Sequence, residues 1–220
     1  MFDFGGTLDS DGEHWLDRFY ELYDQAAISL PREQIKRVFY EADAMCCSDP
    51  LVNKMGLRRL MRHHIRFQFM AHHLSNGSEE EQMIEAFCAK TEDYLERNAR
   101  LLSRLRDLYK MGVVSNFYGN VAVICEEAGL AHSFATILDS TRLGFGKPEP
   151  EIFRLALQQV NVAAEECLFV GDSYERDMLP AIKLGMKTVW LKGPSPRIPE
   201  NAEPVDGVIS NLVELEPLLL

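Results

Sequence analysis

Apolar residues recur every three or four positions from residue 12 to about residue 97, a spacing typical of amphipathic helices. The apolar positions are Trp15, Phe19, Leu22 and Tyr23, then Ile35, Val38 and Phe39, then Leu57, Leu60, Met61, Ile65 and Phe69, then Met83, Ile84, Phe87, Tyr94 and Leu95. Asn76-Gly77 interrupts the pattern, and Ser78 with Glu81 forms a capping-box spacing that predicts where a fourth helix begins. These segments predict a helical unit over residues 12–97.

After residue 98, short apolar runs alternate with helical stretches. Strands are predicted at 112–115, 136–138, 167–171, 187–191 and 208–209, and helices at 101–110, 120–129, 150–160 and 176–185. This alternation is typical of a parallel sheet covered on both faces, in which ligands bind beyond the carboxyl ends of the strands. We predict an α/β protein with a sheet of at least five strands, a core domain of residues 1–11 and 98–220, and an inserted helical cap of residues 12–97. The proline-rich stretch 193–204 is predicted to be a surface loop.

Charge and composition narrow the classes of function. The formal net charge is −11, and so acidic a surface repels nucleic-acid phosphates. No apolar stretch reaches the ~18 residues of a membrane-spanning helix, and the acidic amino terminus is unlike a signal peptide. The five cysteines match no zinc-binding spacing and are expected to be reduced thiols. We expect a cytoplasmic protein that binds neither nucleic acid nor membrane.

Four polar clusters lie at or near the ends of the predicted strands. In chain order they are Asp3-Phe4-Gly5-Gly6-Thr7-Leu8, then Ser115-Asn116, then Lys147 within Gly146-Lys147-Pro148-Glu149-Pro150, then Gly171-Asp172-Ser173 with Asp177 beyond it. Each cluster alone is a weak signal, because an aspartate after a strand is most often a turn or capping residue. All four clusters in this order form a much more specific signal of a functional site.

These residue types suit phosphoryl transfer. A divalent cation held by carboxylates neutralises the repulsion between a carboxylate nucleophile and a phosphate dianion. A lysine and a small hydroxyl hold the remaining phosphate oxygens. Attack by Asp3 on phosphorus would form an aspartyl-phosphate that water then hydrolyses.

In these motifs the chain resembles the haloacid dehalogenase-like hydrolase superfamily. Asp3 to Thr7 matches its Asp-x-Asp-Gly-Thr motif except at Gly5, and the helical segment lies where that superfamily inserts a cap. The resemblance implies a Rossmann-like core and a magnesium-dependent phosphatase of a small phosphorylated metabolite, acting through an aspartyl-phosphate on Asp3.

The resemblance also implies a role for each matching residue. Magnesium is expected on Asp3, the carbonyl oxygen of Gly5 and Asp172, and Asp177 is expected to orient water or Lys147 rather than bind the ion. Phosphate is expected to contact Ser115, Asn116 and Lys147, and the catalytic set is Asp3, Ser115 and Lys147.

Gly5 departs from the superfamily pattern, since most of its phosphatases carry their general acid/base aspartate there. General acid–base help is worth about 10²–10⁴-fold in rate. The change leaves two other readings open: a hydrolase of carbon–halogen or carbon–nitrogen bonds, and a catalytically weak protein that binds phosphorylated ligands. Asp172 and Asp177 argue against dehalogenation. Alkyl phosphates, whose leaving oxygen needs a proton, are expected to turn over slowly unless the cap supplies a substitute acid. Restoring the carboxylate with Gly5→Asp is expected to raise their turnover about tenfold or more.

Two further features lead to expectations. Only Met1 and Phe2 precede Asp3, which makes a poor strand, so the chain is expected either to start at an internal methionine or to have its first strand completed by upstream residues. The pairs His63-His64 and His72-His73 are expected on a solvated or substrate-facing helix face rather than at a metal.

Overall fold

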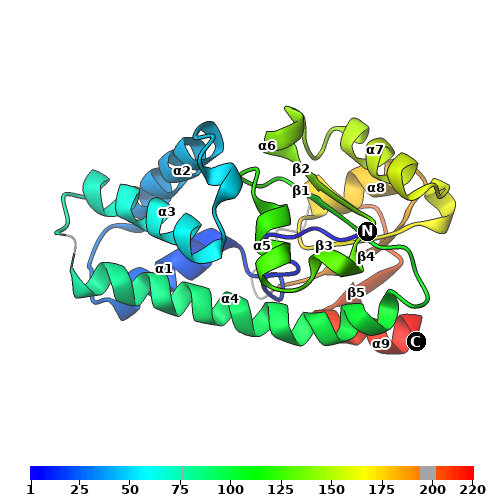
Figure 1. The fold of residues 1–220 in the computed structure, drawn as a ribbon, viewed down its shortest axis with the longest axis horizontal. Helices are drawn as coiled ribbons and strands as arrows, with labels where there is room; N and C mark the ends of the chain where they lie inside the picture. The colour runs from blue at the N-terminus through cyan, green and yellow to red at the C-terminus, as the bar shows by residue number, and fades with distance from the viewer. Residues whose placement is uncertain (76, 194–201) are drawn as a thin grey trace.

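The computed structural model describes residues 1–75, 77–193 and 202–220, which form two lobes. One lobe is helical and the other is built on a sheet, and the long helix α4 (Ser78–Leu105) runs along both (Figure 1). The predicted break at Asn76 and most of the predicted loop 193–204 lie outside the described residues.

The sheet consists of parallel strands, which confirms the predicted fold class. Strand β1 (Gly112–Ser115) pairs with β2 (Thr136–Asp139). Strand β3 (Leu168–Gly171) pairs with β4 (Lys187–Leu191), which pairs with β5 (Gly207–Ile209). All five strands lie where the apolar runs predicted them.

The first residues of the chain join the two groups of strands. Phe2 forms parallel bridges to both Val113 and Val170. Its N–H donates to the carbonyl of Gly112, and the N–H of Asp3 donates to the carbonyl of Val170, both at 2.9 Å. The amino-terminal segment therefore lies between β1 and β3, and it places Asp3 in the middle of the carboxyl edge of the sheet.

Helices α5 (Val121–Glu127) and α7 (Pro150–Val160) pack on β2, and α7 also packs on β1. The predicted helix 176–185 is divided in two, a π-helical turn Tyr174–Met178 followed by α8 (Leu179–Lys183). Pro180 near the start of α8 explains the division, because it has no N–H to continue the pattern of the preceding turn. Two short helices, α6 (Ser140–Leu143) and α9 (Glu216–Leu219), were not predicted.

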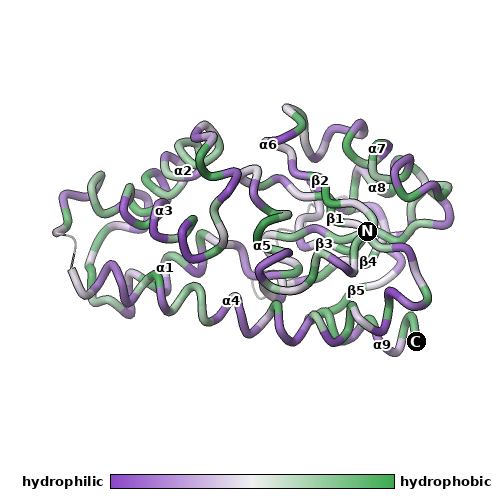
Figure 2. Tube along the Cα trace, in the orientation of Figure 1, coloured by the Kyte–Doolittle hydropathy of each residue, from purple (hydrophilic) through white to green (hydrophobic). Residues whose placement is uncertain are grey.

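The helical lobe, which we call the cap because the cap is predicted there, consists of α1 (Trp15–Gln25), α2 (Arg32–Ser48), α3 (Leu57–Ala71) and the first part of α4. Hydrophobic and hydrophilic residues alternate along these helices (Figure 2), and the apolar positions named from the sequence are mostly buried. Helix α4 continues to Leu105 without interruption, so it also includes part of the separate helix predicted at 101–110. The predicted domain boundary at residue 97 falls inside it.

The histidine pairs do not share a solvated face, contrary to expectation. His64 has no exposed surface and His72 is 8% exposed, whereas His73 is exposed. Helix α3 carries His64 on its inner face, against the aromatic rings of Phe19 and Phe39.

All five cysteines are free thiols, and four of them are buried. Among the described residues, no helix combines the length and the hydropathy that crossing a membrane requires.

The motif loop after Asp3 is tied to α4 by one buried side chain, which gives a stability prediction. Asn98 Nδ2 donates to the carbonyl oxygen of Leu8 at 2.8 Å. Asn98→Ala leaves that carbonyl without its donor and should lower the free energy of unfolding by about 1–3 kcal/mol. The measurement is urea denaturation, with Arg100→Ala as control on the exposed side of the same helix. Equal, small losses in both variants would contradict this anchoring role.

Candidate active site

Lys147 and two aspartates form a buried ionic cluster at the carboxyl edge of the sheet. Lys147 Nζ lies 2.8 Å from Asp3 Oδ1 and 2.6 Å from Asp177 Oδ1. The second oxygen of Asp177 accepts the N–H of Ser173 at 2.9 Å. Both oxygens of Asp177 are therefore engaged by protein groups, and the residue orients Lys147.

Asp172 faces the same cluster from the end of β3. Thr7 Oγ1 lies 3.4 Å from Asp172 Oδ1, and Trp190 Nε1 donates to the carbonyl of Asp172 at 2.7 Å. Gly6 adopts a φ of +84°, and a Cβ there would come within 2.7 Å of the Asp172 carboxyl group. Only glycine at this position lets the motif loop approach that carboxylate so closely.

The three carboxylates are close enough to share one cation. Asp3, Asp172 and Asp177 each offer an oxygen, and these oxygens lie within 4.8 Å of one another. Burial raises the pKa of Asp172 well above its usual range, and the charges of Asp177 and Asp3 add to the effect. A divalent cation would relieve this repulsion, and carboxylate oxygens are the ligands that Mg²⁺ prefers. The donor set therefore fits magnesium.

Lys147 keeps its charge in this environment. Burial alone would lower its pKa, but the charges of Asp177 and Asp3 outweigh burial, and the pKa is raised. A charged ammonium group at the sheet edge can hold an anionic ligand beside Asp3.

Ser115 is the last residue of β1 and Asn116 follows it, and their side chains differ in whether a ligand can reach them. The Ser115 hydroxyl is buried and has no hydrogen-bond partner among the described residues. Asn116 Nδ2 donates to the Lys147 carbonyl at 2.7 Å, and Asn116 Oδ1 accepts the Lys147 N–H at 2.8 Å. The Ser115 hydroxyl can therefore receive a ligand oxygen, whereas the Asn116 side chain fixes the loop that carries Lys147.

A buried aspartate fixes the motif loop against the cap. Asp9 accepts hydrogen bonds from the N–H of Gly6 at 2.7 Å and from the Trp15 indole, and Arg18 lies 3.9 Å away. Burial raises the pKa of Asp9 to about 6. Arg18 in turn donates to the Phe87 carbonyl of α4 at 3.0 Å. The loop that carries Asp3 is thus held by cap helices as well as by the sheet.

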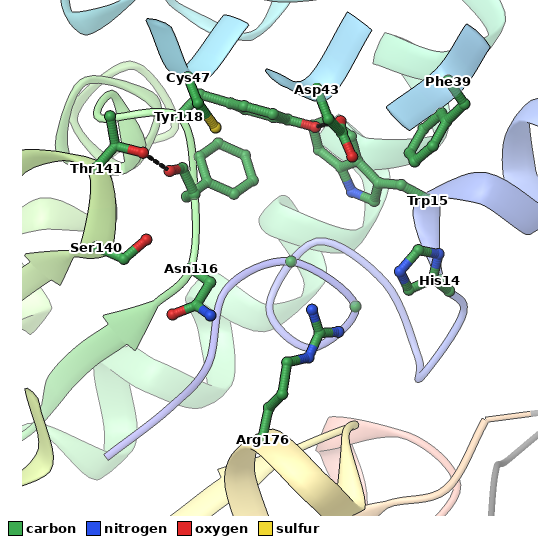
Figure 3. Close-up of a pocket in the computed structure, with 13 residues that line it drawn as sticks. His14, Trp15, Phe39, Asp43, Cys47, Asn116, Tyr118, Ser140, Thr141 and Arg176 are labelled. Carbon is green, nitrogen blue, oxygen red and sulfur yellow. Dashed lines mark hydrogen bonds between the residues drawn. The ribbon is translucent and has the colours of Figure 1, made fainter. Parts of the chain in front are cut away.

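A cavity of about 200 Å³ lies between the cap and the motif loop (Figure 3). It is lined by Gly5, Gly6, His14, Trp15, Phe39, Asp43, Cys47, Asn116, Phe117, Tyr118, Ser140, Thr141 and Arg176. Cap and core both contribute to its wall. The sequence named only Gly5, Gly6 and Asn116 of this set as motif residues, because periodicity cannot tell which cap side chains face the core.

Gly5 borders this cavity with room for a side chain. Within the described part of the chain, a Cβ at Gly5 would meet only the Phe117 ring, at 3.6 Å, and the backbone there is not left-handed. The steric conditions for a carboxylate at this position are therefore met, although the chain has none.

The structure thus brings the motif residues to one edge of the sheet. Asp3, Lys147 and Asp177 are in direct contact, and Asp172 lies beside them. Such a set can activate a carboxylate nucleophile and bind an anionic substrate.

A family model described as haloacid dehalogenase-like hydrolase matches residues 1–185. The chain belongs to this family. The resemblance seen in the four motifs is thereby confirmed, and members of the family are hydrolases.

Curated relatives match over part of the chain. A phosphoserine phosphatase of Thermus thermophilus is 45% identical over 74 residues, which cover 33% of this chain and 30% of that protein. A pyrimidine 5'-nucleotidase of Escherichia coli is 35% identical over 121 residues, 54% of this chain and 53% of that protein. The chain thus matches about half or less of the length of these relatives.

Solved structures match over nearly the whole chain at low identity. A dehalogenase with an intermediate complex has a TM-score of 0.65 and 18% identity, and covers 99% of this chain and 95% of its own. A haloacid dehalogenase-type phosphatase of Thermococcus onnurineus has a TM-score of 0.55 and 23% identity, with the same coverage. At these identities the likeness establishes the fold alone.

The close approach of Gly6 to Asp172 gives a second prediction. Gly6→Ala and Gly144→Ala both place a side chain at a left-handed φ, +84° and +79°, but only the Gly6 site has an atom within 4 Å of the new Cβ. Both should lose about 1 kcal/mol of folding stability.

Only Gly6→Ala should also lose turnover, by roughly 10²-fold, because it displaces the Asp172 carboxylate. Denaturation and steady-state kinetics of the two variants measure these effects. Equal turnover in both would contradict the placement of Asp172 in the site.

Proposed function

We propose that this chain is a magnesium-dependent phosphatase that hydrolyses a small phosphorylated metabolite through an aspartyl-phosphate on Asp3. The observation that carries the proposal is the convergence of one buried lysine and three carboxylates on one point of the sheet edge. The unpartnered Ser115 hydroxyl beside them offers a further contact for a phosphate oxygen.

Each residue has a part in this reaction. Asp3 attacks phosphorus, and its other contacts orient it: the Phe4 N–H donates to Asp3 Oδ1 at 2.7 Å, as does Lys147 Nζ at 2.8 Å. Lys147 and Ser115 hold non-bridging phosphate oxygens, and Asp177 keeps Lys147 in place. The Asn116 side chain does not contact phosphate itself. It holds the backbone of the loop that carries Lys147, and Lys147 contacts the phosphate.

Asp172 and Asp3, with the Gly5 carbonyl, would hold the magnesium ion. When bound, the ion neutralises charge between the nucleophile and the phosphate dianion. Asp177 is less suited to ligation, since its two oxygens already accept from Lys147 and Ser173.

Two alternatives from the sequence rest on Gly5. Attack by Asp3 on the carbon of a carbon–halogen or carbon–nitrogen bond involves no phosphate dianion whose charge a metal ion must neutralise. Dependence on magnesium therefore separates the phosphatase from this alternative. A protein that only binds phosphorylated ligands would not turn over an activated aryl phosphate. The clustered carboxylates favour the phosphatase over both.

Magnesium dependence provides the direct test of the proposal. Asp172→Ala should abolish magnesium-dependent hydrolysis of an aryl phosphate, and Asp3→Asn should abolish hydrolysis altogether. Asp107→Ala, an exposed carboxylate beyond α4, is the matched control and should keep wild-type turnover. The assay is a magnesium titration after treatment with chelator. Undiminished turnover of Asp172→Ala in chelator would refute the metal assignment.

A further inference from the structure

One cap carboxylate enters the cavity from the side opposite the motif loop. Asp43 on α2 lines the same cavity as Gly5 (Figure 3). Its side chain is 26% exposed. Among the described residues that line the cavity, the cap wall therefore carries a carboxylate and the core wall, where Gly5 lies, carries none.

The Asp43 carboxyl group is held by one of its oxygens. Asp43 Oδ1 accepts from the Tyr118 hydroxyl and from His64 Nε2, the latter at 3.1 Å. Asp43 Oδ2 has no hydrogen bond among the described residues. Because both donors approach Oδ1, the group is oriented while Oδ2 remains available to a ligand.

A buried hydrogen-bond chain stands behind this carboxyl group. The Tyr23 hydroxyl lies 3.1 Å from Gln68 Oε1, and Gln68 Nε2 lies 2.8 Å from His64 Nδ1. With the Gln68 amide in this orientation its nitrogen donates to His64 Nδ1, and His64 Nε2 is then the donor to Asp43. Tyr23, His64 and Gln68 have no exposed surface. Apolar residues could fill this interior without leaving any buried polar group that needs a partner. We therefore infer that the hydrogen-bond chain of Tyr23, Gln68 and His64 serves to orient Asp43.

Both lobes contribute to this arrangement. Asp43 and His64 belong to the cap, whereas Tyr118 follows β1 in the core. The position of the carboxyl group over the motif loop therefore depends on contact between cap and core.

We propose that Asp43 is the general acid/base of the reaction, in place of the carboxylate that Gly5 lacks. This rests on the proposed phosphatase function. As an Asp3 oxygen bonds to phosphorus, the bond from phosphorus to the ester oxygen breaks, and the leaving oxygen keeps the electron pair and takes the proton of Asp43 Oδ2. Asp43, now a carboxylate, then accepts a proton from water as the water oxygen attacks the aspartyl-phosphate. Asp3 regains its electron pair, inorganic phosphate leaves and Asp43 is again protonated.

Other titratable side chains of the cavity fit this role less well. His14 Nδ1 accepts the Leu16 N–H at 3.1 Å, so the ring can take up a second proton only by giving up that helix-capping bond. Arg176 does not release its proton in proteins. Burial raises the pKa of the Cys47 thiol, which makes it a weak acid.

The test compares leaving groups rather than total activity. Asp43→Asn should lower kcat/KM for alkyl phosphates by about 10²–10⁴-fold, the range of general acid–base catalysis. Aryl phosphates leave without a proton in the first step, so their loss should be under about tenfold. Glu41→Gln, an exposed carboxylate on the same helix, is the matched control for charge.

Relocation of the carboxylate gives a second readout. Gly5→Asp should raise alkyl phosphate turnover at least about tenfold in the Asp43→Asn background and much less in the unaltered protein. Tyr118→Phe, which removes one donor and keeps the ring, should give a smaller loss that is again selective for alkyl esters. If Asp43→Asn does not fold, the same comparison of alkyl and aryl esters can be made with Tyr118→Phe.

Equal losses for alkyl and aryl esters, or no loss in Asp43→Asn, would overturn the role of Asp43. The role of Asp43 would also be overturned if the unaltered protein hydrolysed aryl phosphates but not alkyl phosphates. Failure of the unaltered protein to hydrolyse any aryl phosphate would instead overturn the phosphatase proposal itself.

Discussion

The site depends on one electrostatic constraint, which is that three carboxylates share a small buried volume with a single lysine. Lys147 lies 2.8 Å from Asp3 and 2.6 Å from Asp177. Among the described residues Asp172 forms no ion pair of this kind, and its pKa is raised by burial and by the charges of Asp177 and Asp3. Unbalanced buried charge is costly. A site of this kind is completed by a cation and an anion together, as a magnesium ion and a phosphate ester would do.

The two lobes contribute different parts of the site. The parallel sheet brings the ends of β1, β3 and the amino-terminal segment to one edge, which fixes the positions of Asp3, Ser115 and Asp172. The cap closes the cavity over that edge and is linked to the core by α4 and by the buried Asp9 and Arg18 contacts. On this account, bond making belongs to the core and proton transfer to the cap.

Much of the core was predictable from the sequence, because each strand is a short apolar run and each motif residue follows or lies near one. The five strands followed from these apolar runs, and the family followed from the motifs around Asp3, Ser115, Lys147 and Asp172. The bridging position of Phe2 was not predictable, since two residues give no periodicity. The cap side of the site was missed for a similar reason. Helical spacing shows that Asp43 and His64 lie on helices, but not that the two side chains meet each other and Tyr118. That contact depends on how α2, α3 and the core pack.

The central claim is that Asp3 becomes phosphorylated during turnover. Rapid acid quenching after mixing with a substrate that carries radiolabelled phosphate, followed by peptide mapping, measures this directly. The account predicts label on the peptide that contains Asp3, formed with magnesium and absent after treatment with chelator or in Asp3→Asn. Steady turnover of the same substrate with label on another residue would contradict it, as would label on Asp3 that forms equally well in chelator.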